Sequence, residues 1–410
     1  MTKSLLFLIF FFIVTATGHG QTLGFSLANG KKKVQIPIEI YSNLVVVPVV
    51  LNETLPLKFV LDTGVRTAIL TQKTFSDILN LPYTRKYSIA GPGGVKVVDA
   101  YITNNVTIQL PGVNGRGHAL LVLEEDYLEL RNYLGTDVHG ILGYELFSRF
   151  IVEINYADKL LTLYRPERFT KKRRFQTVPI TVQDTKPFAV VPVVLQDGTK
   201  INAKLLMDSG ASHALLLDPA SDEKINVPEN VVSSLIGRGL GGEITGKAGR
   251  IKSISLADYT INKVIANFPD PNSYMDSLKG GNDDRNGTIG GEILSRFTTI
   301  YNFPKEEVYL KKNASFKKGF HYNLSGLTIK AKGARLNVFE VTQVRDQSVS
   351  FKAGIEEGDI ILSINGLESS MLDLNIVNSY LNRRPGKKIK LYLDRNGERL
   401  RKQFYLADQI

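Results

Sequence analysis

The amino-acid sequence predicts a mostly β protein in which two related lobes are followed by a smaller α+β module. Three observations lead to this prediction: a long internal repeat, short apolar segments separated by turn residues in both copies, and a different pattern over residues 319–410. The chain has 410 residues, of which 43% are hydrophobic and 22% are charged. This composition is ordinary for a globular protein, and the length is sufficient for two or three domains with their own cores.

The internal repeat consists of three sequence blocks that recur in the same order. The blocks are residues 45–51 and 190–195, residues 57–64 and 203–210, and residues 140–150 and 287–297. Equivalent positions are 144, 146 and 147 residues apart, so the two copies differ only by small insertions. Ordered matches at a nearly constant offset indicate a duplicated unit that extends from about residue 34 to residue 312.

Each copy of the repeat is expected to be rich in strands. Residues 34–40 and 55–61 are apolar or alternating and contain many β-branched side chains, which is typical of strands. Helical patterns are few, at residues 71–79, at residues 143–150 and at the counterpart that ends at Phe297. We therefore expect two sandwich or barrel lobes. Their predicted limits are 34–164 for lobe 1, 165–174 for a basic linker and 175–312 for lobe 2.

Residues 319–410 are expected to fold separately. One amphipathic helix is predicted at residues 373–384, because Leu374, Val377 and Leu381 fall on one face. Pro385 and Gly386 end this helix. The segments with strand character are residues 336–344, 359–364 and 388–393.

The N-terminus has the pattern of a secretory signal peptide. Lys3 is followed by ten apolar residues, 5–14, and then by small residues up to Gly20. This apolar run is too short for a permanent membrane anchor, which needs about 20 apolar residues. We expect residues 1–20 to be removed and the protein to be exported to the periplasm or the extracellular space. The sequence has no Cys, which excludes disulfides, thiolate zinc sites and thiol nucleophiles.

Two short motifs occupy equivalent positions in the repeat, Asp62-Thr-Gly and Asp208-Ser-Gly. Each follows an apolar strand and places a carboxyl group at a turn beside a core, where burial raises its pKa. If a pseudo-twofold axis relates the lobes, the two carboxyl groups meet there and share one proton, because adjacent like charges cannot both ionise. One carboxylate can then act as a general base for water and the other as a general acid toward a carbonyl oxygen.

The residues after each Asp support such a pair. Thr63 and Ser209 supply hydroxyls that can join the two loops, and Gly64 and Gly210 allow backbone N–H groups to approach the carboxylates. A single Asp-Thr-Gly would more often be an ordinary turn. For two copies in equivalent positions, we favour catalysis over a structural role in which both Asp residues only cap turns of a duplicated binding scaffold.

Each Asp motif is followed later in its copy by a short element that ends in Gly, at residues 141–143 and 288–290. Together the motifs and these elements resemble the aspartic peptidases of the pepsin and retropepsin type. The resemblance covers about residues 34–312, with a spacing similar to compact bacterial retropepsin-like lobes. It implies two β-barrel lobes related by a pseudo-twofold axis, with Asp62 and Asp208 as the catalytic pair. It also implies that the second element packs behind each Asp loop. Val65-Arg66 departs from the small or hydroxyl residues that are usual there, and an Arg near the pair could lower a carboxyl pKa or indicate lost activity.

Two Gly-rich segments, residues 90–94 and 236–249, lie between the Asp motif and the second element of each copy. In peptidases of this type such hairpins cover the cleft as flaps, and ordinary surface hairpins are the alternative. Residues 237–242 and 241–247 also match phosphate-loop patterns, but a strand pattern follows where a phosphate loop needs a helix, so we reject both. The flap residues that we single out are Gly91, Gly93, Gly94, Gly239, Gly241 and Gly242.

The C-terminal module resembles a bacterial-type PDZ domain. Residues 353–366, Ala-Gly-Ile-Glu-Glu-Gly-Asp-Ile-Ile-Leu-Ser-Ile-Asn-Gly, carry the resemblance, and the helix and last strand follow in order. Such domains hold a peptide C-terminus on backbone N–H groups while the peptide adds to a strand edge. A packing module that binds no peptide is the alternative. The matching loop consists of Gly326, Leu327, Thr328 and Ile329.

Other chemistry has little support in the sequence. His118, His139, His213 and His321 have no ligand spacing, so we expect no metal, and no organic cofactor is implied. His213 is expected to be an ordinary loop residue, because no G-x-S-x-G element accompanies it.

The net charge of +11 raises the question of a nucleic-acid partner. Residues 21–164 carry 13 basic and 13 acidic residues, and residues 175–304 carry 12 and 14. The positive charge therefore lies in the linker and the C-terminal part rather than on one binding face, and we expect no nucleic-acid partner. The sequence thus predicts an exported aspartic endopeptidase that acts on polypeptides. The alternative is a catalytically inactive peptide-binding protein that uses the same cleft and the PDZ groove.

Overall fold

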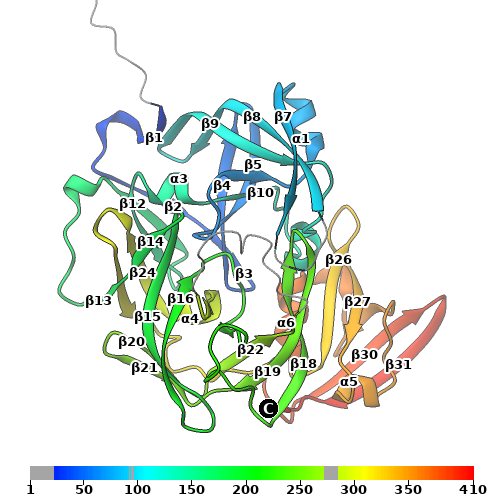
Figure 1. Cartoon of the computed structure of the whole chain (residues 1–410). Coiled ribbons are helices and arrows are strands. Elements are labelled where there is room, and N and C mark those ends of the chain that lie inside the picture. Colours follow the sequence, from blue (N-terminus) through cyan, green and yellow to red (C-terminus); the bar gives the residue numbers. More distant parts are fainter. Residues whose placement is uncertain (1–22, 92, 94–96, 272–284) are drawn as a thin grey trace, which may run out of the picture.

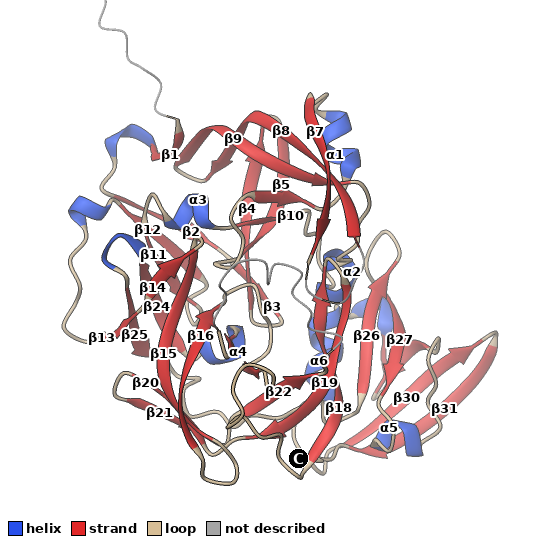
Figure 2. Cartoon of the chain, in the orientation of Figure 1, coloured by secondary structure: helices blue, strands red, loops and turns tan. Residues whose placement is uncertain are grey.

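The computed structural model describes residues 23–91, 93, 97–271 and 285–410 (Figure 1). The predicted signal peptide, residues 1–20, and Gly94 lie outside these described residues. The chain is mostly β, with short helices at the margins of the sheets (Figure 2), and the predicted fold class is confirmed. None of the helices within the described residues is long and apolar enough to cross a membrane.

Lobe 1 is built on one curved sheet in the order β1-β9-β6-β10-β5-β4-β8-β7, with β3 paired to β4. A further pairing between β8 and β9 brings the two sides of this sheet together. The strands are β1 (Gly24–Leu27), β3 (Glu39–Tyr41), β4 (Leu44–Leu51), β5 (Leu55–Leu61), β6 (Ala68–Leu70), β7 (Tyr83–Ala90), β8 (Val97–Leu110), β9 (Val113–Leu123) and β10 (Gly140–Leu142).

Lobe 2 repeats this arrangement in the order β18-β19-β22-β17-β23-β16-β15-β20-β21, with β14 paired to β15. The long β8 of lobe 1 corresponds here to two shorter strands, β19 and β20, so closure into a barrel is only partial. The strands are β14 (Thr181–Gln183), β15 (Lys186–Val194), β16 (Lys200–Met207), β17 (Leu215–Leu217), β18 (Val231–Gly239), β19 (Gly242–Arg250), β20 (Ser253–Leu256), β21 (Tyr259–Asn262), β22 (Ile265–Pro269) and β23 (Gly287–Ile289).

A third sheet, which we call the base sheet, joins the lobes in the order β13-β25-β24-β11-β12-β2. Lobe 1 contributes three neighbouring strands and lobe 2 the other three, and β11 and β24 pair antiparallel at the centre, with Val152 opposite Tyr301. The strands are β2 (Lys33–Pro37), β11 (Ile151–Asn155), β12 (Leu160–Tyr164), β13 (Gln176–Pro179), β24 (Phe297–Asn302) and β25 (Glu307–Lys312).

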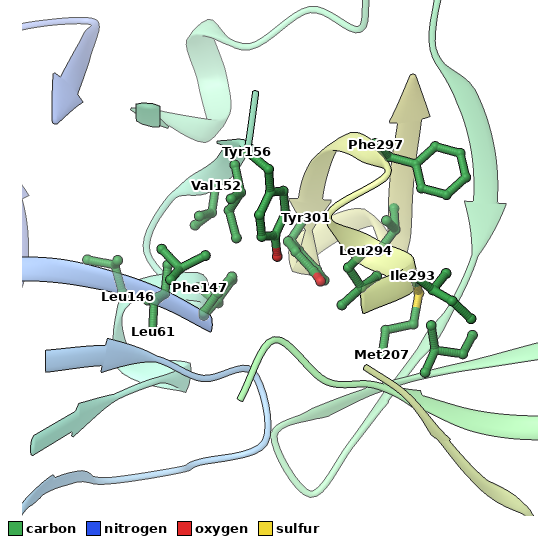
Figure 3. Packing of buried hydrophobic residues seen from close by; sticks show 14 of the residues in the cluster. Leu61, Leu146, Phe147, Val152, Tyr156, Met207, Ile293, Leu294, Phe297 and Tyr301 are labelled. Carbon is green, nitrogen blue, oxygen red and sulfur yellow. The ribbon is translucent and has the colours of Figure 1, made fainter. Parts of the chain in front are cut away.

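One hydrophobic core runs through both lobes and the base sheet. Figure 3 shows its central part, where Leu61 and Phe147 of lobe 1 lie on one side of Tyr156 and Tyr301, and Met207 and Leu294 of lobe 2 lie on the other. The ring of Phe147 stands edge-on to that of Tyr301, with centroids 5.3 Å apart. Because apolar side chains of both lobes belong to this cluster, burial of apolar surface stabilises their relative placement as well as each lobe.

The predicted helices at residues 71–79, 143–150 and before Phe297 are confirmed, although each is shorter than expected. They are α1 (Lys73–Ile78), α3 (Tyr144–Phe147) and α4 (Gly291–Leu294). The expected single strand at residues 34–40 was wrong, because it divides into β2 and β3. Its two halves enter different sheets, and the N–H of Ile38 between them donates to Lys159 O at 3.0 Å.

The C-terminal module has its own sheet, in the order β26-β27-β28-β30-β31, with β29 on β28, and its own core. The predicted helix is α6 (Leu374–Leu381), and Asp373 caps it by accepting the N–H of Ile376. A second helix, α5 (Val349–Lys352), was not predicted. The strands are β26 (Leu327–Lys332), β27 (Val338–Val344), β28 (Ile360–Ile364), β29 (Leu367–Glu368), β30 (Lys388–Arg395) and β31 (Glu398–Tyr405).

Candidate active site

The two Asp motifs lie at the ends of equivalent central strands. Asp62 follows β5 and Asp208 follows β16, and both strands pair in parallel with the short element that comes later in the same lobe, β10 or β23. The N–H of Asp62 donates to Leu142 O and that of Asp208 to Ile289 O, each at 2.9 Å. The short elements therefore fix the backbone at both carboxyl-bearing residues.

Thr63 and Ser209 connect the two Asp loops through reciprocal hydrogen bonds. The N–H of Thr63 donates to Ser209 Oγ at 3.1 Å, and the N–H of Ser209 donates to Thr63 Oγ1 at 3.0 Å. Each hydroxyl then donates to a backbone carbonyl of the opposite lobe, Thr63 to Met207 O at 2.7 Å and Ser209 to Leu61 O at 2.8 Å. Both residues are fully buried, so these bonds hold the loops in one geometry.

The carboxyl groups of Asp62 and Asp208 are brought together by this frame. A Cβ atom added at Gly64 would lie 3.0 Å from Asp62 Oδ1 and 3.7 Å from both carboxyl oxygens of Asp208. The N–H of Gly64 donates to Asp62 Oδ1 at 2.6 Å, and that of Gly210 to Asp208 Oδ1 at 2.8 Å. A Cβ atom added at Gly210 would lie 2.2 Å from Asp62 Oδ2, which is closer than real Cβ contacts allow. Glycine at position 210 is therefore required for the carboxyl group of the other lobe to fit.

The electrostatics of the pair favour a retained proton. Burial raises the pKa of Asp62 well above its usual range, and the negative charge of Asp208 raises it further. Burial likewise raises the pKa of Asp208, against the hydrogen bonds from Gly210 and Asp62, which lower it. Both shifts disfavour ionisation, and adjacent carboxyl groups titrate together, so this arrangement favours a pair that shares one proton.

Positive charges near the pair come from residues that the sequence motifs did not indicate. Lys186 lowers the pKa of both carboxyl groups, and Arg285 lowers that of Asp208, each as a smaller contribution than burial. Arg66, whose position after the first Asp motif departs from the family pattern, has an exposed side chain. Lys186 begins β15 and belongs to no recognisable motif, so sequence reasoning had no signal for it.

The short elements behind the loops depend on glycine. A Cβ atom added at Gly143 would lie 2.2 Å from Val65 O, and one added at Gly290 would lie 2.2 Å from His213 O. The N–H of Tyr144 donates to Val65 O at 2.8 Å, which joins the start of α3 to the first Asp loop. The packing behind each Asp loop that the family resemblance implied is thus present in both lobes.

The Gly-rich segments form two hairpins, β7–β8 in lobe 1 and β18–β19 in lobe 2, which we call flap 1 and flap 2. Their tips meet, since a Cβ atom added at Gly93 would lie 2.0 Å from Gly242 O, and one at Gly91 would lie 2.8 Å from Leu240 Cβ. Gly239 ends β18, and Gly241 belongs to the turn of flap 2. The rejected phosphate-loop patterns fall on this same strand hairpin.

Leu240, at the tip of flap 2, packs against an apolar cluster of lobe 1 that includes Leu128, Leu130 and Val65. Flap 2 therefore reaches across to the opposite lobe. His213 lies in a bend as expected, but its Nε2 is buried, and burial lowers its pKa to about 4. The ring is consequently neutral at physiological pH and adds no positive charge beside the second Asp loop.

The predicted peptide-binding loop of the C-terminal module is occupied by contacts within the chain. The N–H of Gly326 donates to Asn323 Oδ1 at 2.9 Å, and the N–H of Leu327 to Ser325 Oγ at 3.2 Å. Gly326 and Leu327 are buried, and Thr328 and Ile329 belong to β26. The amides of Gly326 and Leu327 thus already have partners within the chain.

Comparison with protein families agrees with this geometry. The family model described as aspartyl protease matches residues 47–146 and 190–293, and the model described as PDZ domain matches residues 324–403. Both lobes belong to the aspartyl protease family, and the C-terminal module is a PDZ domain. The two matched ranges of the aspartyl protease family contain Asp62 and Asp208 respectively. No curated protein matches the chain.

Proposed function

We propose that the protein is an exported aspartic endopeptidase that hydrolyses peptide bonds with a water molecule held by Asp62 and Asp208. The aspartyl protease lobes support a peptidase in general terms. The observation that carries the specific proposal is the close approach of the two carboxyl groups. A Cβ atom added at Gly64 would lie 3.0 Å from Asp62 Oδ1 and 3.7 Å from both carboxyl oxygens of Asp208, within the frame that Thr63 and Ser209 provide. Such a pair holds a base and an acid at one point, as water attack on an amide requires.

We propose that the pair, which titrates as a unit, starts with its one shared proton on Asp62. Asp208 then accepts a proton from the water molecule as its oxygen attacks the carbonyl carbon, and Asp62 donates its proton to the carbonyl oxygen. In the second step the tetrahedral diol returns a proton to Asp62, Asp208 passes its proton to the amide nitrogen, and the C–N bond breaks. The pair ends in its starting protonation state.

The test is cleavage of an unfolded polypeptide, such as reduced and carboxymethylated lysozyme, by the protein that begins after residue 20. Asp62→Asn and Asp208→Asn should each abolish cleavage, since either change removes the acid–base pair. Asp258→Asn, at an exposed turn of lobe 2, is the matched control and should retain full activity. Cleavage that persists in Asp62→Asn would refute the assignment of the pair.

The alternative proposal is a catalytically inactive protein that binds peptides in the same cleft and at the PDZ domain. It is favoured if the wild-type protein binds unfolded polypeptide across pH 3–8 without cleaving it. The exposed position of Arg66 and the presence of all residues of both Asp motifs weigh against this alternative. For export, N-terminal sequencing of protein recovered from the periplasm or medium should give a start at or shortly before Gln21.

The PDZ domain supports a further role in peptide or partner docking. We propose that any such docking uses the strand edge of β26 rather than a preformed carboxylate site, because Asn323 and Ser325 already accept the amides of the loop. Amidated and free-acid versions of one peptide should then bind with similar affinity. A strong preference for the free carboxylate would contradict this proposal.

A further inference from the structure

The PDZ domain is docked on lobe 1 through a short segment that the sequence did not indicate. This segment, residues 129–135, contains α2 (Leu130–Leu134), which lies beside β26 (Figure 2). Asn132 Nδ2 donates to Ala331 O at 2.7 Å, and the guanidinium of Arg131 donates to Ala334 O at 2.9 Å. The side chains of lobe 1 thus bind the backbone at the end of an edge strand.

The same segment also reaches the helix of the PDZ domain. A Cβ atom added at Gly135 would lie 2.4 Å from Leu374 Cβ, at the start of α6. Glu129 pairs with Lys330 of β26 at 3.5 Å. Strand β26 and helix α6 border the groove in which PDZ domains add a peptide strand. While residues 129–135 are docked there, this end of the groove is covered by the protein's own lobe 1.

On its other side, the segment holds flap 2. Arg238, close to the tip of flap 2, donates to Tyr133 Oη at 3.1 Å, and its guanidinium lies 5.1 Å from the centre of the Tyr133 ring. Leu240 packs against the cluster that contains Leu130. Flap 2 is therefore held on lobe 1 by residues of the same helix that contacts the PDZ domain.

Flap 2 has a second connection to the C-terminal part of the chain. Tyr322, just before the PDZ domain, donates its hydroxyl to Ser234 Oγ in β18 at 2.5 Å. Arg250, at the end of β19, pairs with Asp408 at 2.8 Å. The base of flap 2 and its tip are thus both bonded to residues that flank the PDZ domain or belong to the helix that contacts it.

We propose that the PDZ domain is an internal brake that keeps flap 2 closed. A substrate can enter only when the flap tips at Gly93 and Gly242 separate and Arg238 leaves Tyr133. Docking of β26 on Asn132 stabilises α2 in the position that retains Arg238, so it disfavours opening. A peptide that adds to the outer edge of β26 must displace residues 129–135 and would release the brake. This inference rests on the proposed function for its effect on cleavage, but not for its effect on the flap.

The test uses the full chain with Asn132→Asp, which keeps the shape of the side chain but places a carboxylate against Ala331 O. Asn114→Asp, at an exposed position of β9, is the charge-matched control. Hydrogen exchange is measured by mass spectrometry for β18, β19 and β26, together with kcat/KM on unfolded polypeptide. We expect hydrogen exchange in β18 and β19 to rise. We also expect kcat/KM to increase about three- to tenfold, the size of effect that follows from loss of the hydrogen bond between Asn132 and Ala331. The control should match wild type.

A second variant separates docking from flap release. Tyr133→Phe removes the hydroxyl that accepts from Arg238 and leaves the PDZ contact in place, so it should loosen β18 and β19 but not β26. The double variant should show little more exchange in β18 and β19 than either single variant, because both changes act on the same series of contacts between β26 and Arg238. In Asn132→Asp, hydrogen exchange could rise in β26 while exchange in β18 and β19 stays at the wild-type level. That result would refute the proposal that the PDZ domain keeps flap 2 closed. Flap loosening without cleavage by any variant would support the brake and refute the peptidase proposal.

Discussion

Thr63 and Ser209 each donate a backbone N–H to the hydroxyl of the other, at 3.1 and 3.0 Å. These two bonds, together with the carbonyls that the hydroxyls reach in the opposite lobe, connect positions 146 residues apart in the sequence. The carboxyl groups of Asp62 and Asp208 are adjacent because of this connection, so their chemistry depends on residues that do not react.

Replacement of Thr63 by Val keeps the shape of the side chain but removes the hydroxyl. The N–H of Ser209 and the carbonyl of Met207 then lose their partners in a buried site, which should lower the free energy of unfolding by about 1–3 kcal/mol. Urea denaturation measures this loss. Thr181→Val, at an exposed position of β14, is the control and should change stability by less than about 0.5 kcal/mol. Equal stability of the two variants would contradict the role of the reciprocal bonds.

The two glycines of the Asp motifs should differ in their tolerance of alanine. A Cβ atom at Gly210 would lie 2.2 Å from Asp62 Oδ2, whereas one at Gly64 has its nearest contact, Asp62 Oδ1, at 3.0 Å. Gly210→Ala should therefore displace the carboxyl group of Asp62 and reduce kcat by about 100-fold, as a shift of about 1 Å at a reacting group does. Gly64→Ala should lose less activity. The reverse order would show that Asp62 is not held as the contacts imply.

Asp62→Asn should change how stability depends on pH. The pKa of Asp62 is raised in the folded protein, because the ionised carboxylate is disfavoured there. The contribution of Asp62 to the free energy of unfolding is therefore full below the pKa of the unfolded chain. This contribution is lost as the pH rises through the pKa of the folded protein. The Asn variant does not ionise and should gain stability relative to wild type as pH rises. The measurement is Tm of both proteins at pH 3.5 and 7.5. With Asp258→Asn as control, a Tm difference that is constant over this range would rule out a raised pKa.

Two buried tyrosines of the base sheet should respond differently to loss of the hydroxyl. Tyr301 Oη is buried and has no hydrogen-bond partner among the described residues, whereas Tyr309 Oη donates to Glu307 and accepts from Asn302. Tyr301→Phe should be neutral or stabilising, and Tyr309→Phe should cost about 1 kcal/mol. Calorimetry of both variants checks this. A loss above about 1 kcal/mol for Tyr301→Phe would mean that its hydroxyl is hydrogen-bonded in solution.

The parts of the fold that the sequence predicted are those with a local pattern or a repeated motif. Strand β5 and its Asp loop were predictable because apolar residues, Asp and Gly occur together and recur 146 residues later. The equivalence of Gly143 and Gly290 came from the same repeat. The carboxyl groups could be expected to meet for the same reason, although only the structure supplies the hydrogen bonds that bring them together.

The parts that were not predicted depend on contacts between distant segments. The pairing of Val152 with Tyr301 in the base sheet has no local signal, because either strand would alternate in the same way beside another partner. Helix α2 has five residues between Glu129 and Gly135, both in the left-handed conformation, and is too short to show periodicity. Its functional interest lies in what it contacts, namely Ala331 and Arg238, and neither contact is encoded in its own composition.

The base sheet has a consequence for the integrity of the chain. The linker between the lobes presents four exposed basic residues in a row, 171–174, which is a ready substrate for a protease with trypsin-like preference. Since β11 and β24 pair directly and the core is continuous below them, a cut there would leave both lobes joined without the covalent connection. We expect a nicked protein to remain one particle in solution and to separate into two fragments only when it is denatured.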